Sequence, residues 1–242
     1  MASATLSVER RSALETLASD LRRIFGNRFL SLCAYRTSDT SNSTHSIALV
    51  DQLRFEDLAA CVPLASGWER RGLAVPLLLE EHEFNRTLDV FPLEYGDIIA
   101  HHVVIAGTDP FHGVTVSESD RRRACELQAK SHLIHLREGY LESNGDARAI
   151  VGLIRASAAG FRQLLENLVT LVRPGSADGK NHDDLAENAQ ALLGISAELI
   201  REVLATDAAD GPSAIADPTA LLERYIAAID RIWEFVDEWK RL

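Results

Sequence analysis

Residues 88–111 read LDVFPLEYGDIIAHHVVIAGTDPF and open with a short apolar run that carries Asp89, Glu94 and Asp97 at its edges. A short run rich in β-forming residues between turn signals predicts a strand. Pro92 removes a backbone donor from this run, which is tolerated in an edge strand or at a bulge. We therefore predict an edge or bulged strand over residues 88–95 and assign the other elements outward from it.

Upstream of this stretch, the hydrophobic pattern changes repeatedly between the helical period and the strand period. Apolar residues at near-helical spacing predict a first helix, which Gly26 ends. Three apolar runs predict strands, the last of them central because it is continuously apolar. The predicted helices cover residues 7–25, 55–71 and 80–86, and the predicted strands cover 28–35, 46–53 and 73–79. This order predicts a mixed sheet with flanking helices.

Downstream of Gly113 the pattern becomes helical. Four long apolar-periodic segments joined by short loops are typical of an antiparallel bundle. They begin near residues 117, 149, 185 and 217. Asp217-Pro218 supplies an N-cap followed by proline at the first helical position, which predicts the start of the last helix. The predicted fold class is α+β, with a mixed-sheet domain over residues 1–115 followed by an antiparallel four-helix bundle over residues 116–242.

Composition excludes several classes of partner. The 242-residue chain is 46% hydrophobic and has a formal net charge of −11. Residues 1–117 hold 10 bases against 15 acids and residues 118–242 hold 15 against 21, so neither half is basic. Nucleic acid and anionic membranes both require a basic surface, and we predict neither as a partner.

Cysteine usage and the N-terminus predict a cytoplasmic protein. The three cysteines are odd in number and widely spaced, as reduced thiols are, and do not suggest a disulfide framework. The N-terminus shows no basic region followed by an apolar core, and no apolar run is long enough to cross a membrane.

Two short motifs carry a resemblance to a known superfamily. They are Leu88-Asp89-Val90-Phe91-Pro92 and Gly107-Thr108-Asp109-Pro110, and residues 31–50 and the helix that contains Glu126 and Leu133 extend the likeness. Over roughly its first two thirds the chain resembles bacterial nucleotidyltransferase-fold proteins, the superfamily that includes the aminoglycoside nucleotidyltransferases. The resemblance implies a nucleotidyltransferase-like domain followed by a helical bundle.

The chain departs from that superfamily at the positions that carry its chemistry. Active members place Gly-Ser at the end of the first strand and Asp-x-Asp at the start of the next, where the two carboxylates hold divalent metals. The corresponding positions here are Cys33-Ala34 and Ser46-Ile47-Ala48. Serine and alanine cannot replace two carboxylate ligands of Mg²⁺. The resemblance leaves Asp89 as the one residual catalytic acid, and it implies a retained fold with lost chemistry.

If the chain were aligned differently with the Asp-x-Asp motif, Asp39 or Asp51 would have to serve as a ligand of the metal. Asp39 falls in a polar loop, and Asp51 lies five residues beyond Ser46, a displacement of more than roughly 15 Å along a strand. Residues 1–129 contain no lysine, so a phosphate of a bound nucleotide would need arginine. Arg36 and Arg54 are the predicted phosphate contacts, with Arg86 as a further candidate.

Other constellations favour structural interpretations. His132 and His135 have the best ligand spacing in the chain, because residues three apart share a helix face, but a solvated helix face is favoured. His101 and His102, as neighbours in a strand, are expected to face apart. Cys33 has no histidine nearby, so an inert buried thiol is expected.

Three further pairs are also interpreted structurally. Asp89 and Glu94 are read as surface acids in preference to a residual acid–base pair. The spacing of Arg123 and His132 does not support the Arg-x(4–6)-His motif of ribonucleases that have similar bundles. Trp233 and Trp239 are expected in the core or in dimer contacts.

These observations predict a catalytically degenerate nucleotidyltransferase-like protein that acts as a nucleotide-binding, protein-interaction or regulatory module, and they assign it no cofactor. The alternative is an active enzyme that uses Mg²⁺ to transfer a nucleoside monophosphate to a hydroxyl of a small molecule or protein. A third interpretation is a structural subunit that forms a homodimer through its bundle.

Overall fold

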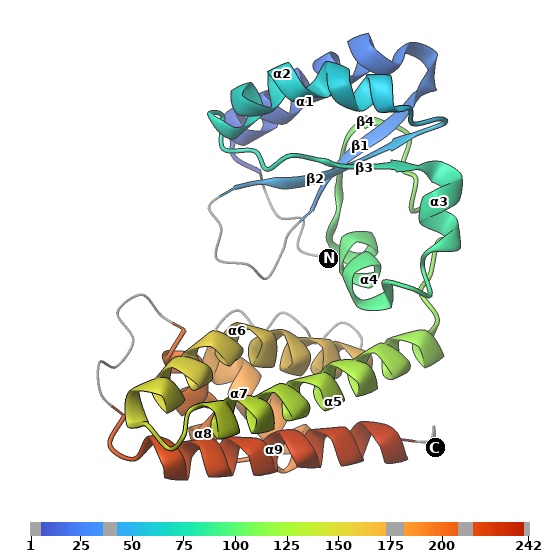
Figure 1. Ribbon diagram of the computed structural model, residues 1–242. Helices are drawn as coiled ribbons and strands as arrows, with labels where there is room; N and C mark the ends of the chain where they lie inside the picture. The colour runs from blue at the N-terminus through green and yellow to red at the C-terminus, as the bar shows by residue number, and fades with distance from the viewer. Residues whose placement is uncertain (1–5, 36–42, 173–181, 208–214, 240–242) are drawn as a thin grey trace. The chain divides into compact units, whose positions relative to one another are not determined.

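The computed structural model describes residues 6–35, 43–172, 182–207 and 215–239. Contacts within the chain divide it into two compact units, Met1–Ser117 and Glu118–Leu242. Strands occur in the first unit and the second is helical, so the fold class is α+β (Figure 1).

A four-stranded mixed sheet forms the centre of the first unit. Its strands are β1 (Phe29–Tyr35), β2 (His45–Val50), β3 (Leu77–Glu80) and β4 (Val103–Gly107), in the order β3-β2-β1-β4. Strand β1 is antiparallel to both β2 and β4, and β2 is parallel to β3. The prediction that the third strand is central was wrong. Its apolar run extends to an exposed edge, where Val75 and Leu77 face solvent.

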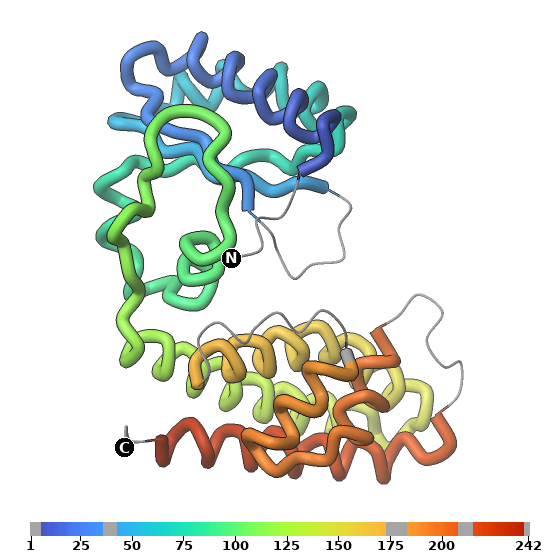
Figure 2. The backbone as a smooth tube through the Cα atoms, turned by 180° about the vertical axis from the view of Figure 1, so that it is seen from behind, coloured from blue at the N-terminus to red at the C-terminus, as the bar shows by residue number. Residues whose placement is uncertain are grey.

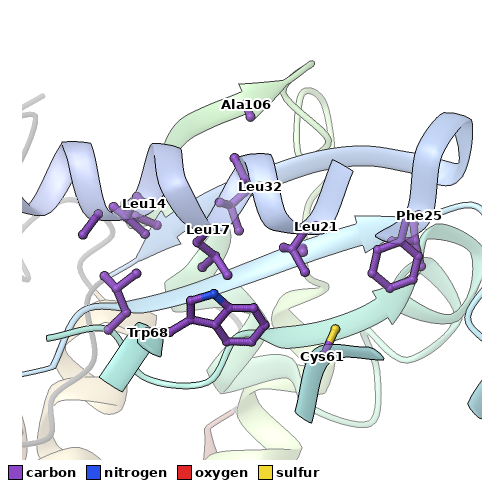
Figure 3. Packing of buried hydrophobic residues seen from close by; sticks show 14 residues of the cluster. Leu14, Leu17, Leu21, Phe25, Leu32, Cys61, Trp68 and Ala106 are labelled. Atoms are coloured by element: carbon purple, nitrogen blue, oxygen red, sulfur yellow. The ribbon is translucent and has the colours of Figure 1, made fainter. Parts of the chain in front are cut away.

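Helices α1 (Val8–Phe25) and α2 (Phe55–Glu69) cover one face of the sheet. Helix α1 begins at Ser7, whose side chain accepts a hydrogen bond from the Arg10 amide, and it ends at Gly26, whose φ is +57°. Its apolar side faces Trp68 of α2, and the Trp68 indole donates a 3.0 Å hydrogen bond to Asp20 of α1 (Figure 3). These contacts form the larger core of the unit.

Helices α3 (Glu81–Arg86) and α4 (Pro92–His101) close the opposite face. Phe84 stands between Tyr95 and Phe111, with ring centroids 4.8 Å and 5.1 Å away. Cys33 and Ile47 of the sheet pack into this aromatic cluster. Both faces of the sheet are therefore covered by side chains.

The strand predicted over residues 88–95 is wrong. Residues 88–90 form a turn in which the Thr87 carbonyl accepts from the amides of Val90 and Phe91, and α4 follows. Pro92 occupies the first turn of α4, where its missing amide has no partner to lose. Tyr95 and Ile98, three residues apart, point from this helix into the core. The apolar run thus has the period of a helix.

The second unit consists, in its described part, of five helices (Figure 2). They are α5 (Glu118–Glu142), α6 (Ala147–Val172), α7 (His182–Leu193), α8 (Ala197–Ala205) and α9 (Pro218–Glu238). Helix α5 packs against both α6 and α9. Helix α9 begins as predicted, because the Asp217 side chain accepts from the Ala220 amide at 2.9 Å.

The single helix predicted to begin near residue 185 is divided into α7 and α8. Gly194 adopts a φ of +66°, which ends α7. Ser196 then caps α8 by accepting from the Leu199 amide, and the Gln190 side chain accepts from Ala197 at 2.8 Å. Helices long and apolar enough to span a bilayer are absent from the described ranges.

Candidate functional site

Ser46 and Ala48, which the resemblance equates with the metal-binding carboxylates of active nucleotidyltransferases, are buried. Ser46 and Ala48 of β2 are 1% and 0% exposed. Ala48 belongs to the core beneath α1 and α2, and Ser46 shares that face because strand residues two apart point to the same side. The Ser46 hydroxyl has no hydrogen-bond partner among the described residues. A carboxylate at either position would lie in an apolar core.

The residues equated with Gly-Ser are also buried. Ala34 packs in the core beneath α1 and α2, whereas Cys33 points to the aromatic cluster on the other face. Burial, with a smaller contribution from the nearby Asp109 carboxylate, raises the pKa of the Cys33 thiol to about 12. Burial also raises the pKa of Cys61, and it raises that of Cys125 to about 12. All three cysteines are free, buried thiols and are poor nucleophiles near neutral pH.

Asp89 lies in the exposed turn between α3 and α4, and Glu94 lies in the exposed first turn of α4. The edge strand predicted to carry these two acids is absent, because neither residue is in a strand. Instead both carboxylates are accessible to solvent beside one helix start.

Arg54 is exposed at the beginning of α2. Its guanidinium donates to the Gln52 side-chain oxygen at 2.6 Å and 3.2 Å. It belongs to the helix layer on one side of the sheet, whereas Asp89 belongs to the layer on the other side (Figure 1). The structure therefore does not bring these two predicted site residues together. Arg36 lies outside the described residues.

A bidentate ion pair that the sequence did not reveal stands near Arg54. The Arg28 guanidinium donates two 2.7 Å hydrogen bonds to the Asp57 carboxylate, an arrangement that fixes both groups. Asp57 also accepts from the Arg54 amide at 2.9 Å. The hydrogen bonds from Arg28 are the main cause that lowers the pKa of Asp57. This pair connects the segment just before β1 to the start of α2 and is structural.

His132 forms a polar cluster inside the helical unit. One of its ring nitrogens, Nε2, lies 2.6 Å from the Tyr225 hydroxyl of α9, and Ser157 of α6 donates to the same oxygen at 3.3 Å. Burial lowers the pKa of His132 to about 4, with a smaller contribution from His135. Burial raises the pKa of Tyr225. The neutral imidazole therefore accepts a hydrogen bond from the Tyr225 hydroxyl, and the cluster links three helices.

The predicted solvated face is wrong for His132. His135 is exposed and its ring lies 3.3 Å from Glu138, so the two histidines do not converge on a metal site. The position of His132 on the packed side of α5 could have been predicted from the sequence. His132 continues the helical spacing of the buried residues Cys125, Ala129 and Leu136.

His101 and His102 occupy the end of α4, and they do not lie in a strand. His102 Nδ1 lies 2.9 Å from the Ile99 carbonyl, and its Nε2 lies 3.2 Å from an Asp109 oxygen. The Phe111 amide donates to that same oxygen at 2.9 Å. His101 is instead exposed, with Nδ1 3.2 Å from the Asp97 carbonyl. The adjacent histidines have separate partners, and the contact of His102 with Asp109 stabilises the turn after β4.

A hollow of about 220 Å³ lies at the start of α5 and is lined by Glu118, Ser119, Arg122 and Trp239. Arg122 is already held at 3.0 Å by both Glu126 and the Val236 carbonyl. No three His, Cys, Asp or Glu side chains in the described ranges gather closely enough to hold a metal ion.

Comparison with known proteins adds no relative: no protein-family model and no curated protein matches the chain.

Proposed function

We propose that the first unit is a nucleotidyltransferase-like domain that has lost metal-dependent transfer, and that the chain acts as a binding or regulatory module. The observation that carries this proposal is the burial of Ser46 and Ala48 beneath α1 and α2. Mg²⁺ binding in this class of enzyme needs carboxylates open to the substrate phosphates. At these positions the chain has small side chains in a packed core.

The resemblance and the topology support the same proposal. The chain order of α1, β1, β2 and α2 agrees with the helix–strand–strand–helix order expected from the sequence. The opposite sheet face, where Ile47 points, is filled by Phe84 and Tyr95. A substrate cleft over either face would require these packed side chains to move.

Calorimetric titration of the full chain tests the loss of transfer chemistry. ATP, GTP, CTP and UTP would each be titrated with and without Mg²⁺. We expect no metal-dependent heat. Binding without metal dependence supports a nucleotide-binding module, and absence of binding supports a module for protein partners. Metal-dependent binding would contradict the proposal.

Restoring a carboxylate offers an independent test. Ser46→Asp places a charge in the core beneath α1 and α2 without a counter-charge, so it is expected to unfold the first unit and confer no Mg²⁺ binding. Ser46→Ala is the matched control, since it is neutral and smaller. A folded Ser46→Asp protein that binds Mg²⁺ would show that this position opens to a site.

The alternative is an active nucleotidyltransferase that uses a site away from these positions. The exposed carboxylates of Asp89 and Glu94 at the start of α4 favour it as a second candidate. Such an enzyme would transfer a nucleoside monophosphate to a hydroxyl, and Asp89→Asn would abolish the transfer. Turnover that survives Asp89→Asn would exclude that assignment.

A further inference from the structure

An exposed row of apolar side chains follows the length of helix α5. Leu127, Ile134 and Leu141 are 71%, 43% and 75% exposed. They are seven residues apart, so they lie almost on one line along a helix. The opposite side of α5, which contains Cys125, Ala129, Leu133 and Leu136, already packs into the helical unit. The exposed row is therefore not needed for the core of its own unit.

Charged side chains of opposite sign border this row. At 100° per residue, Arg123, Lys130 and Arg137 lie on one side of it. The acids Asp120 and Glu138, with the uncharged Ser131 between them, lie on the other. Most of these charged side chains also have a contact within their own chain. Arg123 lies 3.9 Å from Asp120, Arg137 lies 3.5 Å from Asp230, and Lys130 rests on the Trp233 ring. The Arg137–Asp230 and His135–Glu138 pairs are exposed, and exposed pairs contribute little stability, whereas Lys130 and Trp233 are half-buried.

This distribution of charge is complementary to the same face of α5 in a second copy of the chain when the two helices are parallel. In a pair related by a two-fold axis parallel to the helices, the basic side of one α5 faces the acidic side of the other. Arg137 then stands beside Glu138 of the second copy at the same level, twice per pair. In an antiparallel pair, Lys130 would instead face Arg137, which is repulsive.

We propose that the chain forms a homodimer in which two α5 helices pack in parallel along Leu127, Ile134 and Leu141. In coiled coils apolar residues along the seam pair the helices, and flanking charges set the orientation. Here one apolar position in each seven residues, in place of the usual two, would form the seam. The proposal deepens the interaction role proposed above and rests on it. Calorimetry with nucleotides does not depend on the dimer, so the failure of either idea can be recognised separately.

The mass of the full chain in solution is the first test. Sedimentation or light scattering is expected to give twice the 26.6 kDa of one chain. Ile134→Glu places two charges at the centre of the interface and is expected to give a single chain. Val62→Glu is the matched control, because Val62 is an exposed apolar residue of α2, and it is expected to leave the dimer intact. Circular dichroism would establish that both variants keep their helices.

Several outcomes of this measurement would overturn the proposal. A monomeric unmodified chain would do so, and so would a dimer that survives Ile134→Glu. Loss of the dimer in Val62→Glu as well would place the interface elsewhere.

Orientation is tested by cross-linking and by charge reversal. Leu127→Cys brings two thiols together in a parallel pair, whereas in an antiparallel pair residue 127 meets residue 141. Oxidation of Leu127→Cys is therefore expected to give a covalent dimer that the unmodified chain, whose cysteines are buried, does not form. Arg137→Glu is expected to weaken the parallel dimer, and Arg137→Glu with Glu138→Arg to restore it. Absence of the cross-link in a dimeric protein, or a tighter dimer with Arg137→Glu alone, would overturn the parallel arrangement.

Discussion

Acidification is expected to destabilise the helical unit through His132. The neutral imidazole accepts a hydrogen bond from the Tyr225 hydroxyl, and burial lowers the pKa of His132 to about 4 in the folded chain, against about 6.5 when unfolded. Between these values the unfolded chain binds more protons, so stability falls as pH falls through that window. From pH 7 to pH 5 the loss attributable to this group is about 2 kcal/mol.

Urea unfolding of the full chain at pH 7, 6 and 5, followed by circular dichroism, measures this loss. His132→Gln is the comparison, because glutamine keeps an acceptor near Tyr225 and does not titrate. The free energy of unfolding of the unmodified chain should fall by about 2 kcal/mol more than that of the variant. Equal pH dependence in both proteins would refute the reasoning, as would an NMR titration that places the pKa of His132 near 6.5.

Three further perturbations test the packing. Gly107→Ala should lower the free energy of unfolding, measured in urea, by more than about 3 kcal/mol. The added Cβ would lie 2.0 Å from the Leu30 carbonyl oxygen, and the residue has a φ of +82°. Gly113→Ala, which has a similar φ of +76° but open space around it, should cost only about 1–2 kcal/mol, and equal costs would contradict the close approach at Gly107. Ser46→Ala should raise the melting temperature, because it removes a buried hydroxyl without a partner, at a gain of about 1 kcal/mol. Phe84→Ala should cost about 3–5 kcal/mol in the same assay, since the ring is fully buried between two others, and a loss below 1 kcal/mol would show a loose cluster.

The spacing at which apolar residues repeat along the sequence was sufficient to predict most elements of the fold. The first helix, the strand pair β1–β2 and the last helix follow their sequence signals, including Gly26 at one helix end and Asp217 at another helix start. The α4 region was assigned incorrectly because a short apolar run does not distinguish a strand from a buried helix. Pro92 favoured both interpretations, since proline is tolerated at a strand edge and at the start of a helix.

The candidate site was less predictable, because it depends on contacts between distant residues. The Arg28–Asp57 pair joins positions separated by 29 residues, and no local pattern indicates it. His132 could have been placed inside from its spacing to Cys125 and Leu136, but its hydrogen-bond partner Tyr225 could not. Burial of Ser46 required knowledge of which sheet face α1 and α2 cover.

The position of β4 beside β1 also bears on how the first unit is made. Strands β1 and β2 are close in sequence, but β4 completes the sheet only after residues 103–107 have been synthesised. Pairing over such a separation is slow because the chain must close a long loop first. Until then β1 has an unpaired edge, which is a template for association with other chains. A fragment that ends before Val103 would therefore be expected to aggregate during synthesis, whereas one that extends past Phe111 would keep the edge covered.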